Sequence, residues 1–138
     1  MKILYIIYLL LILILFSSCS EHIVDYTPSV DLLVNPNIVT AKFSDIQRKV
    51  FNKSCAISGC HVTGVQAPDL SGNSYTVLVS KASTQGLNYI EPGNPSQSYL
   101  YQKLLNSNDS RMPLNAPQLN QSVIDSISAW ISNGAINN

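Results

Sequence analysis

Two cysteines and a histidine stand together near the middle of the 138-residue chain, in the stretch CAISGCH. Cys55 and Cys60 enclose four residues, and His61 follows the second cysteine directly. Two thiols can add across the vinyl groups of a haem, and a histidine after the second thiol then places its imidazole under the iron. The sequence therefore predicts covalently attached haem c, bound by Cys55, Cys60 and His61, with His61 as an iron ligand.

The spacing of these cysteines is wider than the C-x-x-C-H pattern that is usual for haem attachment. Because the porphyrin fixes the distance between its vinyl groups, the two additional residues must bulge outward. Ser58 and Gly59 favour the sharp turn that this requires. The alternative is a plain disulfide between Cys55 and Cys60, in which His61 has no ligand role.

Met112 is the only methionine after Met1, and it lies in SRMPL between loop-like stretches. Fifty residues separate it from His61, enough chain to pass around a haem edge. A thioether in the second axial position gives His/Met coordination, which raises the reduction potential relative to two histidines. We expect Met112 as the second iron ligand; the alternative is a gap-filling core residue. Arg111 is expected to pair with a haem propionate, to face a partner or to be solvated.

The first 18 residues predict a signal peptide, because Met1-Lys2 gives a positive start and an apolar run follows from Ile3 to Phe16. The run is too short for a comfortable membrane span. Its end, LFSSC, resembles the lipobox of bacterial lipoproteins, which predicts acylation at Cys19 and a lipid anchor. Ser20 is compatible with an outer-membrane destination. The anchored protein is expected to be periplasmic or surface-exposed. An ordinary signal peptide cut nearby is the alternative.

The assignment of Cys19 to lipid leaves too few ligands for other metal centres. Two thiols cannot hold an iron–sulfur cluster, which needs four cysteines. A zinc site would have only Cys55, Cys60 and His61, since the other histidine, His22, lies near the anchor. The chain has eight basic and eight acidic residues and loses Lys2 with the signal, so we find no basic patch and expect no nucleic-acid partner.

The mature chain is long enough for one small domain. Residues 19–40 predict a lipidated N-terminus and tether, and residues 41–138 predict the domain. Its first helix is expected in AKFSDIQRKVFNKSC, with Ser44 and Gln47 as a capping box and apolar residues at helical spacing. A second helix is expected after Pro95, with Ser96 or Ser98 as the N-cap. The apolar face of the second helix is predicted to comprise Leu100, Tyr101, Leu104 and Leu105.

The last helix is predicted within LNQSVIDSISAWISNGA, capped by Asn120 or Ser122 and ended by Gly134. Its apolar face is predicted to comprise Val123, Ile124, Ile127, Trp130 and Ile131. Between the helices, turn signals such as EPGNP predict long loops, and YTVLVS is either a short helix or a strand. Loops of this length in a small domain usually need a staple or a ligand, and a haem would supply the missing core.

From residue 41 onward several motifs occur in a characteristic order: FSDIQRKVFNKSCAISGCH, DLSG, EPGNPSQSYLYQKL, RMP and VIDSISAWISNGA. This pattern resembles the cytochrome c-like domains of bacterial exported proteins, related to those called planctomycete-type cytochrome c. The resemblance implies axial ligands at His61 and Met112 and thioether bonds at Cys55 and Cys60. It also implies the small all-α cytochrome c fold, in which about three helices and long loops surround a haem and the terminal helices cross.

The expected function is electron transfer rather than catalysis. With both axial positions filled, iron only changes its oxidation state, and the sequence contains neither a Ser-His-Asp order nor a phosphate-binding glycine loop. A redox partner protein is therefore expected to dock transiently at an exposed haem edge. The main alternative is a haem-free binding or structural lipoprotein with a Cys55–Cys60 disulfide, and a peroxidase-like role, with Met112 away from the iron, is a third.

Overall fold

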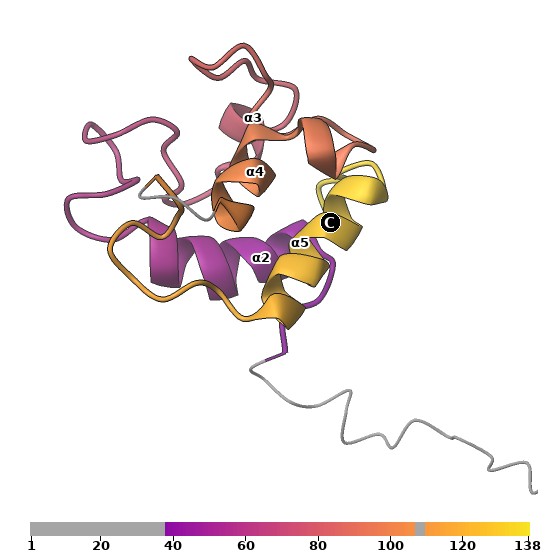
Figure 1. Cartoon of the computed structure of the whole chain (residues 1–138), viewed down its shortest axis with the longest axis horizontal. Helices are drawn as coiled ribbons and strands as arrows, with labels where there is room; N and C mark the ends of the chain where they lie inside the picture. The colour runs from indigo at the N-terminus through magenta and orange to yellow at the C-terminus, as the bar shows by residue number, and fades with distance from the viewer. Residues whose placement is uncertain (1–37, 107–109) are drawn as a thin grey trace, which may run out of the picture. The chain divides into compact units, whose positions relative to one another are not determined.

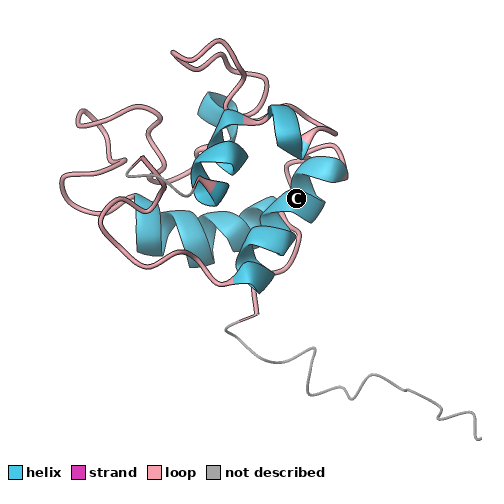
Figure 2. Ribbon diagram, viewed as in Figure 1, coloured by secondary structure: helices cyan, strands magenta, loops and turns pink. Residues whose placement is uncertain are grey.

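The computed structural model describes residues 38–106 and 110–138, so the predicted signal peptide, Cys19 and residues 20–37 lie outside the described part. The described residues belong to one compact unit, Asn35–Asn138. They contain no β-strand, only the isolated bridges Val79–Ile90 and Ala82–Asn88, which confirms the all-α class for this part of the chain (Figure 2). The helical elements are α2 (Phe43–Ile46), η2 (Gln47–Cys55), α3 (Tyr75–Leu78), η3 (Pro95–Gln97), α4 (Tyr99–Leu105) and α5 (Gln121–Ser132).

The predicted first helix is present as α2 and η2, which follow each other without a break and are here called the first helix. Phe43, Ile46, Val50 and Phe51 are buried and form its core-facing side. The η2 part is wound as a π-helix, and at its end the amide of Ala56 donates to the carbonyl of Phe51, five residues back, at 2.7 Å. The first helix therefore carries the chain from the core to Cys55.

The capping box predicted at Ser44 and Gln47 is wrong. The helix begins earlier, with Lys42 at the N-cap position and no side-chain capping bond from it. The free amides of the first turn are instead satisfied by Asn138: Phe43 donates to its side-chain Oδ1 and Ser44 to its main-chain oxygen, both at 2.9 Å. Asn138, distant in the sequence, thus caps the helix start that the local pattern assigned to Ser44.

The predicted last helix is present as α5, with Gly134 in the left-handed region at φ +91° just after its end. Asn120 occupies the N-cap position, but its side chain makes no capping hydrogen bond. Four residues of its predicted apolar face are buried, whereas Val123 is only half-buried. Trp130 packs on Phe43, with ring centroids 5.6 Å apart, where α5 crosses the first helix (Figure 1). The buried residues of this face are Ile124, Ile127, Trp130 and Ile131.

The predicted second helix is α4, which begins after Ser98. Ser98 does not cap the helix with its side chain; its Oγ donates to the carbonyl of Asn94 and accepts from the amide of Glu91, both at 2.9 Å. Leu104 is buried as expected, but Leu105 is 47% exposed. Successive residues of a helix point about 100° apart, so a helix that turns Leu104 to the core directs Leu105 away from it.

YTVLVS contains a short helix, α3, followed at once by an extended residue. Val79 leaves the helix in β conformation and forms the isolated bridge with Ile90. Leu78 and Ile90 are both fully buried. The open choice between helix and strand is therefore decided in favour of a helix of one turn.

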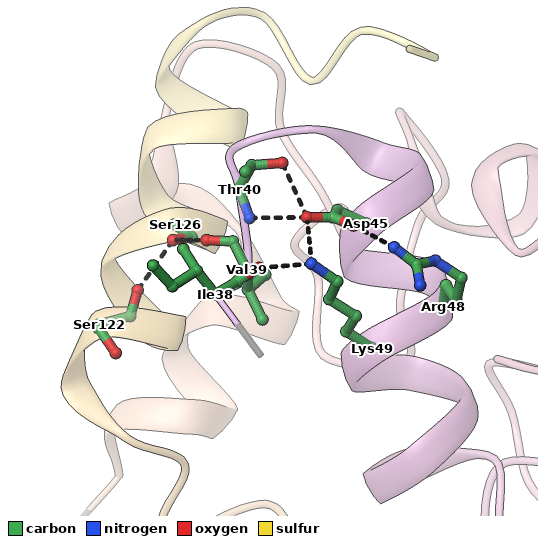
Figure 3. A network of polar contacts seen from close by, with 8 residues as sticks. All are labelled: Ile38, Val39, Thr40, Asp45, Arg48, Lys49, Ser122 and Ser126. Atoms are coloured by element: carbon green, nitrogen blue, oxygen red, sulfur yellow. Dashed lines mark hydrogen bonds and ion pairs between the residues drawn. The ribbon is translucent and has the colours of Figure 1, made fainter. Parts of the chain in front are cut away.

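A polar network joins the start of the domain to the first helix (Figure 3). Asp45 accepts hydrogen bonds from the amide of Thr40 at 3.0 Å and from its hydroxyl at 2.9 Å. The same carboxylate pairs with Lys49 at 2.9 Å and with Arg48 at 2.8 Å. Val39, which precedes the expected start of the domain, is buried, and its carbonyl accepts from Ser126 of α5 at 2.8 Å.

We predict that Asp45→Asn destabilises the domain at pH 7 and that the loss shrinks in acid. Burial alone would raise the pKa of Asp45, but hydrogen bonds from Lys49 and Thr40 outweigh it and hold the pKa well below its usual range. A depressed pKa stabilises the fold above about pH 4, the value of an unfolded carboxyl, and this contribution is lost as the pH falls toward the lower folded value.

Melting temperatures of the wild type and of Asp45→Asn between pH 7 and pH 2 test this prediction. Asp125→Asn is the matched control, because Asp125 accepts a hydrogen bond from Gln121 at an exposed position of α5. A difference between wild type and Asp45→Asn that stays the same at pH 2 and pH 7 would contradict the proposed role of the Asp45 carboxylate.

Candidate functional site

The first helix ends at Cys55, and a tight turn then leads to Cys60. The amide of Cys60 donates to the carbonyl of Ile57 at 2.9 Å, and Gly59 lies in the left-handed region at φ +81°. Ile57, Ser58 and Gly59 are exposed, so the residues between the thiols bulge outward. The turn expected at Ser58 and Gly59 is therefore present.

Cys55 and Cys60 are free thiols and are both half-buried. Burial, and to a smaller extent the neighbouring Cys60 thiol, together raise the pKa of Cys55 to about 11. At neutral pH Cys55 is therefore a protonated thiol. Its side chain also packs against the hydrophobic core, which fixes the position from which it can react.

His61 is held at both its backbone and its ring. Its amide donates to the carbonyl of Cys55 at 3.1 Å, and its Nδ1 lies 3.0 Å from the carbonyl oxygen of Pro68. A carbonyl only accepts hydrogen bonds, so Nδ1 carries the proton and the lone pair of a neutral ring lies on Nε2. This is the usual arrangement of histidines that bind a metal, whose second ring nitrogen donates to a carbonyl or carboxylate.

The loop after His61 is tied to the first helix by Gln47. The amide of Leu70 donates to the carbonyl of His61 at 2.9 Å, and the carbonyl of Leu70 accepts from Gln47 Nε2 at 2.8 Å. The other end of the amide group, Gln47 Oε1, accepts from the amide and hydroxyl of Ser74 at 3.0 and 2.6 Å. Sequence reasoning assigned Gln47 to a cap, and no local pattern indicated this role.

Met112 lies in a separate loop, half-buried against the hydrophobic core. Its amide donates to the carbonyl of Lys103 in α4 at 2.8 Å. The structure thus gathers Cys55, Cys60 and His61 in one segment, whereas no described hydrogen bond joins Met112 to them. In the view of Figure 1, both loops lie toward the Cys55 end of the first helix.

Arg111, beside Met112, has unused hydrogen-bonding capacity. Its Nη2 donates to the carbonyl of Ala116 at 3.0 Å. Within residues 38–106 and 110–138, its Nη1 is the one buried side-chain nitrogen or oxygen that has no hydrogen-bond partner. A buried guanidinium nitrogen without an acceptor is costly, and the planar guanidinium suits a carboxylate. Arg111 is therefore prepared to bind an anionic group.

A cavity of about 520 Å³ lies between the first helix and the segment that leads into α5, and none of the four predicted haem-binding residues lines it. Three basic residues, Arg48, Lys49 and Lys53, are among those that line it. The overall charge balance did not indicate this group, although all three residues lie in the predicted first helix. Arg48 and Lys49 are paired with Asp45. The lining residues are Val39, Arg48, Lys49, Val50, Lys53, Ser54, Gln118, Leu119, Asn120 and Val123.

In the part of the chain that the structure describes, no group of three or more His, Cys, Asp or Glu side chains is placed to hold a metal ion. A site with one histidine and one methionine is not a group of this kind. None of the helices described is long and apolar enough to cross a membrane.

The chain matches no protein-family model, no curated protein and no solved structure.

We predict that Cys55 of the reduced, haem-free protein reacts slowly with an alkylating agent at pH 8. An unfolded cysteine has a pKa of about 8.5, so a folded pKa of about 11 lowers the reactive thiolate fraction at pH 8 about two hundredfold. Iodoacetamide labelling followed by peptide mass spectrometry measures the rate in folded and urea-unfolded protein. Equal rates in the two states would contradict the burial of this thiol.

Proposed function

We propose that the chain is an exported, lipid-anchored domain of the monohaem c-type cytochrome kind, which carries single electrons between redox partners. The observation that carries this proposal is the hydrogen bond between Nδ1 of His61 and the carbonyl of Pro68. It fixes the ring tautomer and leaves Nε2 for iron, at the position where the sequence pattern places the ligand. His61 also follows directly after the second of two free thiols.

The other residues fit haem c as well. Cys55 and Cys60 have the free thiols that two thioether bonds require. Met112 would supply a thioether to the iron, and the buried Nη1 of Arg111 suits a haem propionate. The loops between the helices make up most of the domain, and a bound planar group would give them an additional core.

The residues of the site also favour electron transfer over catalysis. Haem c, when bound, supplies a one-electron couple between ferric and ferrous iron. His61 and Met112 are the residues that would hold the iron; with both bound, no position would remain for a substrate, and the methionine would raise the reduction potential relative to two histidines. The protein accordingly serves a redox partner protein and is not an enzyme.

The proposed location follows from the N-terminal sequence. Removal of residues 1–18 and acylation of Cys19 would anchor the domain to a membrane of the cell envelope, with residues 20–37 as a tether, because Val39 and Thr40 already pack on the domain. The domain then faces the periplasm or the cell surface, and the membrane contact is made by lipid. The competing function is a haem-free binding or structural lipoprotein, which the closeness of the Cys55 and Cys60 thiols would permit as a disulfide.

We predict that the mature protein, produced together with a haem-attachment system, shows a strong Soret band and retains haem after denaturation. The covalent bonds require both thiols, so a Cys55→Ala/Cys60→Ala double variant made in the same way should lose its haem when denatured. Absorption spectra and intact-protein mass spectrometry measure both results. A colourless wild-type protein with a Cys55–Cys60 disulfide would sink the electron-carrier proposal in favour of the haem-free alternative.

We predict that Met112→Ala lowers the reduction potential and alters the haem spectrum, because the thioether ligand is lost and water or another group replaces it. Leu114→Ala is the matched control, since Leu114 lies two residues further along the same loop and is 52% exposed. Spectroelectrochemical titration measures both variants. An unchanged potential and spectrum in Met112→Ala would exclude the methionine as a ligand while leaving haem attachment intact.

A further inference from the structure

We propose that Gln47 is the residue that positions His61, by holding the loop of residues 61–74 so that the Pro68 carbonyl stays against the imidazole. The proposal rests on the proposed function, because it assigns to Gln47 control over an iron ligand. Gln47 lies in the first helix, fourteen positions before His61, and none of the described hydrogen bonds of its side chain is to the histidine. It acts through the loop backbone.

Every hydrogen-bonding position of the Gln47 side chain is used. Nε2 donates to the carbonyl of Leu70 at 2.8 Å and to Oδ1 of Asn52 at 2.7 Å. Oε1 accepts both hydrogen bonds from Ser74. Gln47 is 7% exposed and Ser74 1% exposed, so water cannot replace these bonds cheaply. The side chain therefore has one orientation, and the loop has one position relative to the first helix.

The loop transmits this constraint to His61 over a few bonds. Leu70, which Gln47 holds by its carbonyl, donates its own amide to the carbonyl of His61 at 2.9 Å. Pro68 lies two residues before Leu70, and its carbonyl accepts from the histidine ring. Release of Leu70 thus weakens the support of the His61 carbonyl and of its ring, while the amide of His61 still donates to the carbonyl of Cys55.

A second set of contacts holds the same segment from its exposed side. Asp69, between Pro68 and Leu70, accepts from the hydroxyl of Thr63 at 2.6 Å and from the amide of Ser71 at 2.9 Å. These bonds close the loop on itself but do not connect it to a helix. Gln47 supplies the connection to the rigid part of the domain, so its loss should move the Pro68 carbonyl even while the Asp69 contacts persist.

The consequence for a bound iron follows from the chemistry of imidazole. A hydrogen bond from Nδ1 to a carbonyl makes the ring a stronger electron donor and fixes its rotation. Stronger donation favours ferric iron, so loss of the Pro68 contact should shift the reduction potential upward. It should also change the ring orientation, which the electron paramagnetic resonance of the ferric protein reports.

The test uses Gln47→Leu, which keeps most of the side-chain volume and removes all four hydrogen bonds. In the reduced haem protein we expect the Leu70 amide to exchange with solvent about tenfold faster. We also expect an upward shift of the potential and altered ferric resonance lines. The matched control is Gln102→Leu, because Gln102 is a helical glutamine in α4 that donates to the carbonyl of Ser96 at an exposed position. The control should leave all three measurements unchanged.

Ser74→Ala is the second variant, in case Gln47→Leu does not fold. It removes only the 2.6 Å bond from the Ser74 hydroxyl to Gln47, so the same three changes should appear at smaller size. Faster exchange of Leu70 with an unchanged potential and resonance would show a purely structural role and overturn the proposal. Unchanged exchange would overturn it too. A wild-type protein without a Soret band would instead overturn the proposed function on which the proposal rests.

Discussion

The path of the long loop after His61 depends on the buried amide group of Gln47. The described loop from His61 to Ser74 contains no helix or strand and cannot satisfy its backbone groups by regular pairing. The glutamine takes over part of that task, because it binds the loop at Leu70 and again at Ser74. Each polar group left unpaired there would cost about 1–3 kcal/mol of stability, so these hydrogen bonds fix the position of the loop relative to the first helix.

The helices were largely predictable because their signals are local. The apolar spacing from Ile124 to Ile131 indicated both the position of α5 and the side that it buries. The helix start was not predictable in the same way. Phe43 and Ser44 are capped by Asn138, which lies at the far end of the chain and makes no sequence pattern with them. The prediction that Leu105 faces the core was wrong for a related reason, since a periodic run does not say which of two adjacent leucines faces the core.

The candidate site likewise has features that the local sequence determines and others that depend on the tertiary structure. The turn before Cys60 was predictable because Ser58 and Gly59 determine it locally, and Gly59 adopts the left-handed conformation that suits glycine. The contacts of His61 with Pro68 and of Gln47 with Leu70 join segments that meet only in the folded domain. Residue types can propose a ligand, but the hydrogen bond that orients it belongs to the tertiary structure.

The side-chain atoms that have no bonding partner support the haem proposal independently of the cysteine spacing. Among the described residues, the buried polar side chains are hydrogen-bonded except at Nη1 of Arg111, beside the predicted ligand Met112. Folded proteins rarely leave such a group unpaired without a functional reason. The ring nitrogen Nε2 of His61 and two free thiols add donors and nucleophiles of the types that haem c requires. A simple disulfide would use the thiols, but it would give a partner neither to Nε2 of His61 nor to Nη1 of Arg111.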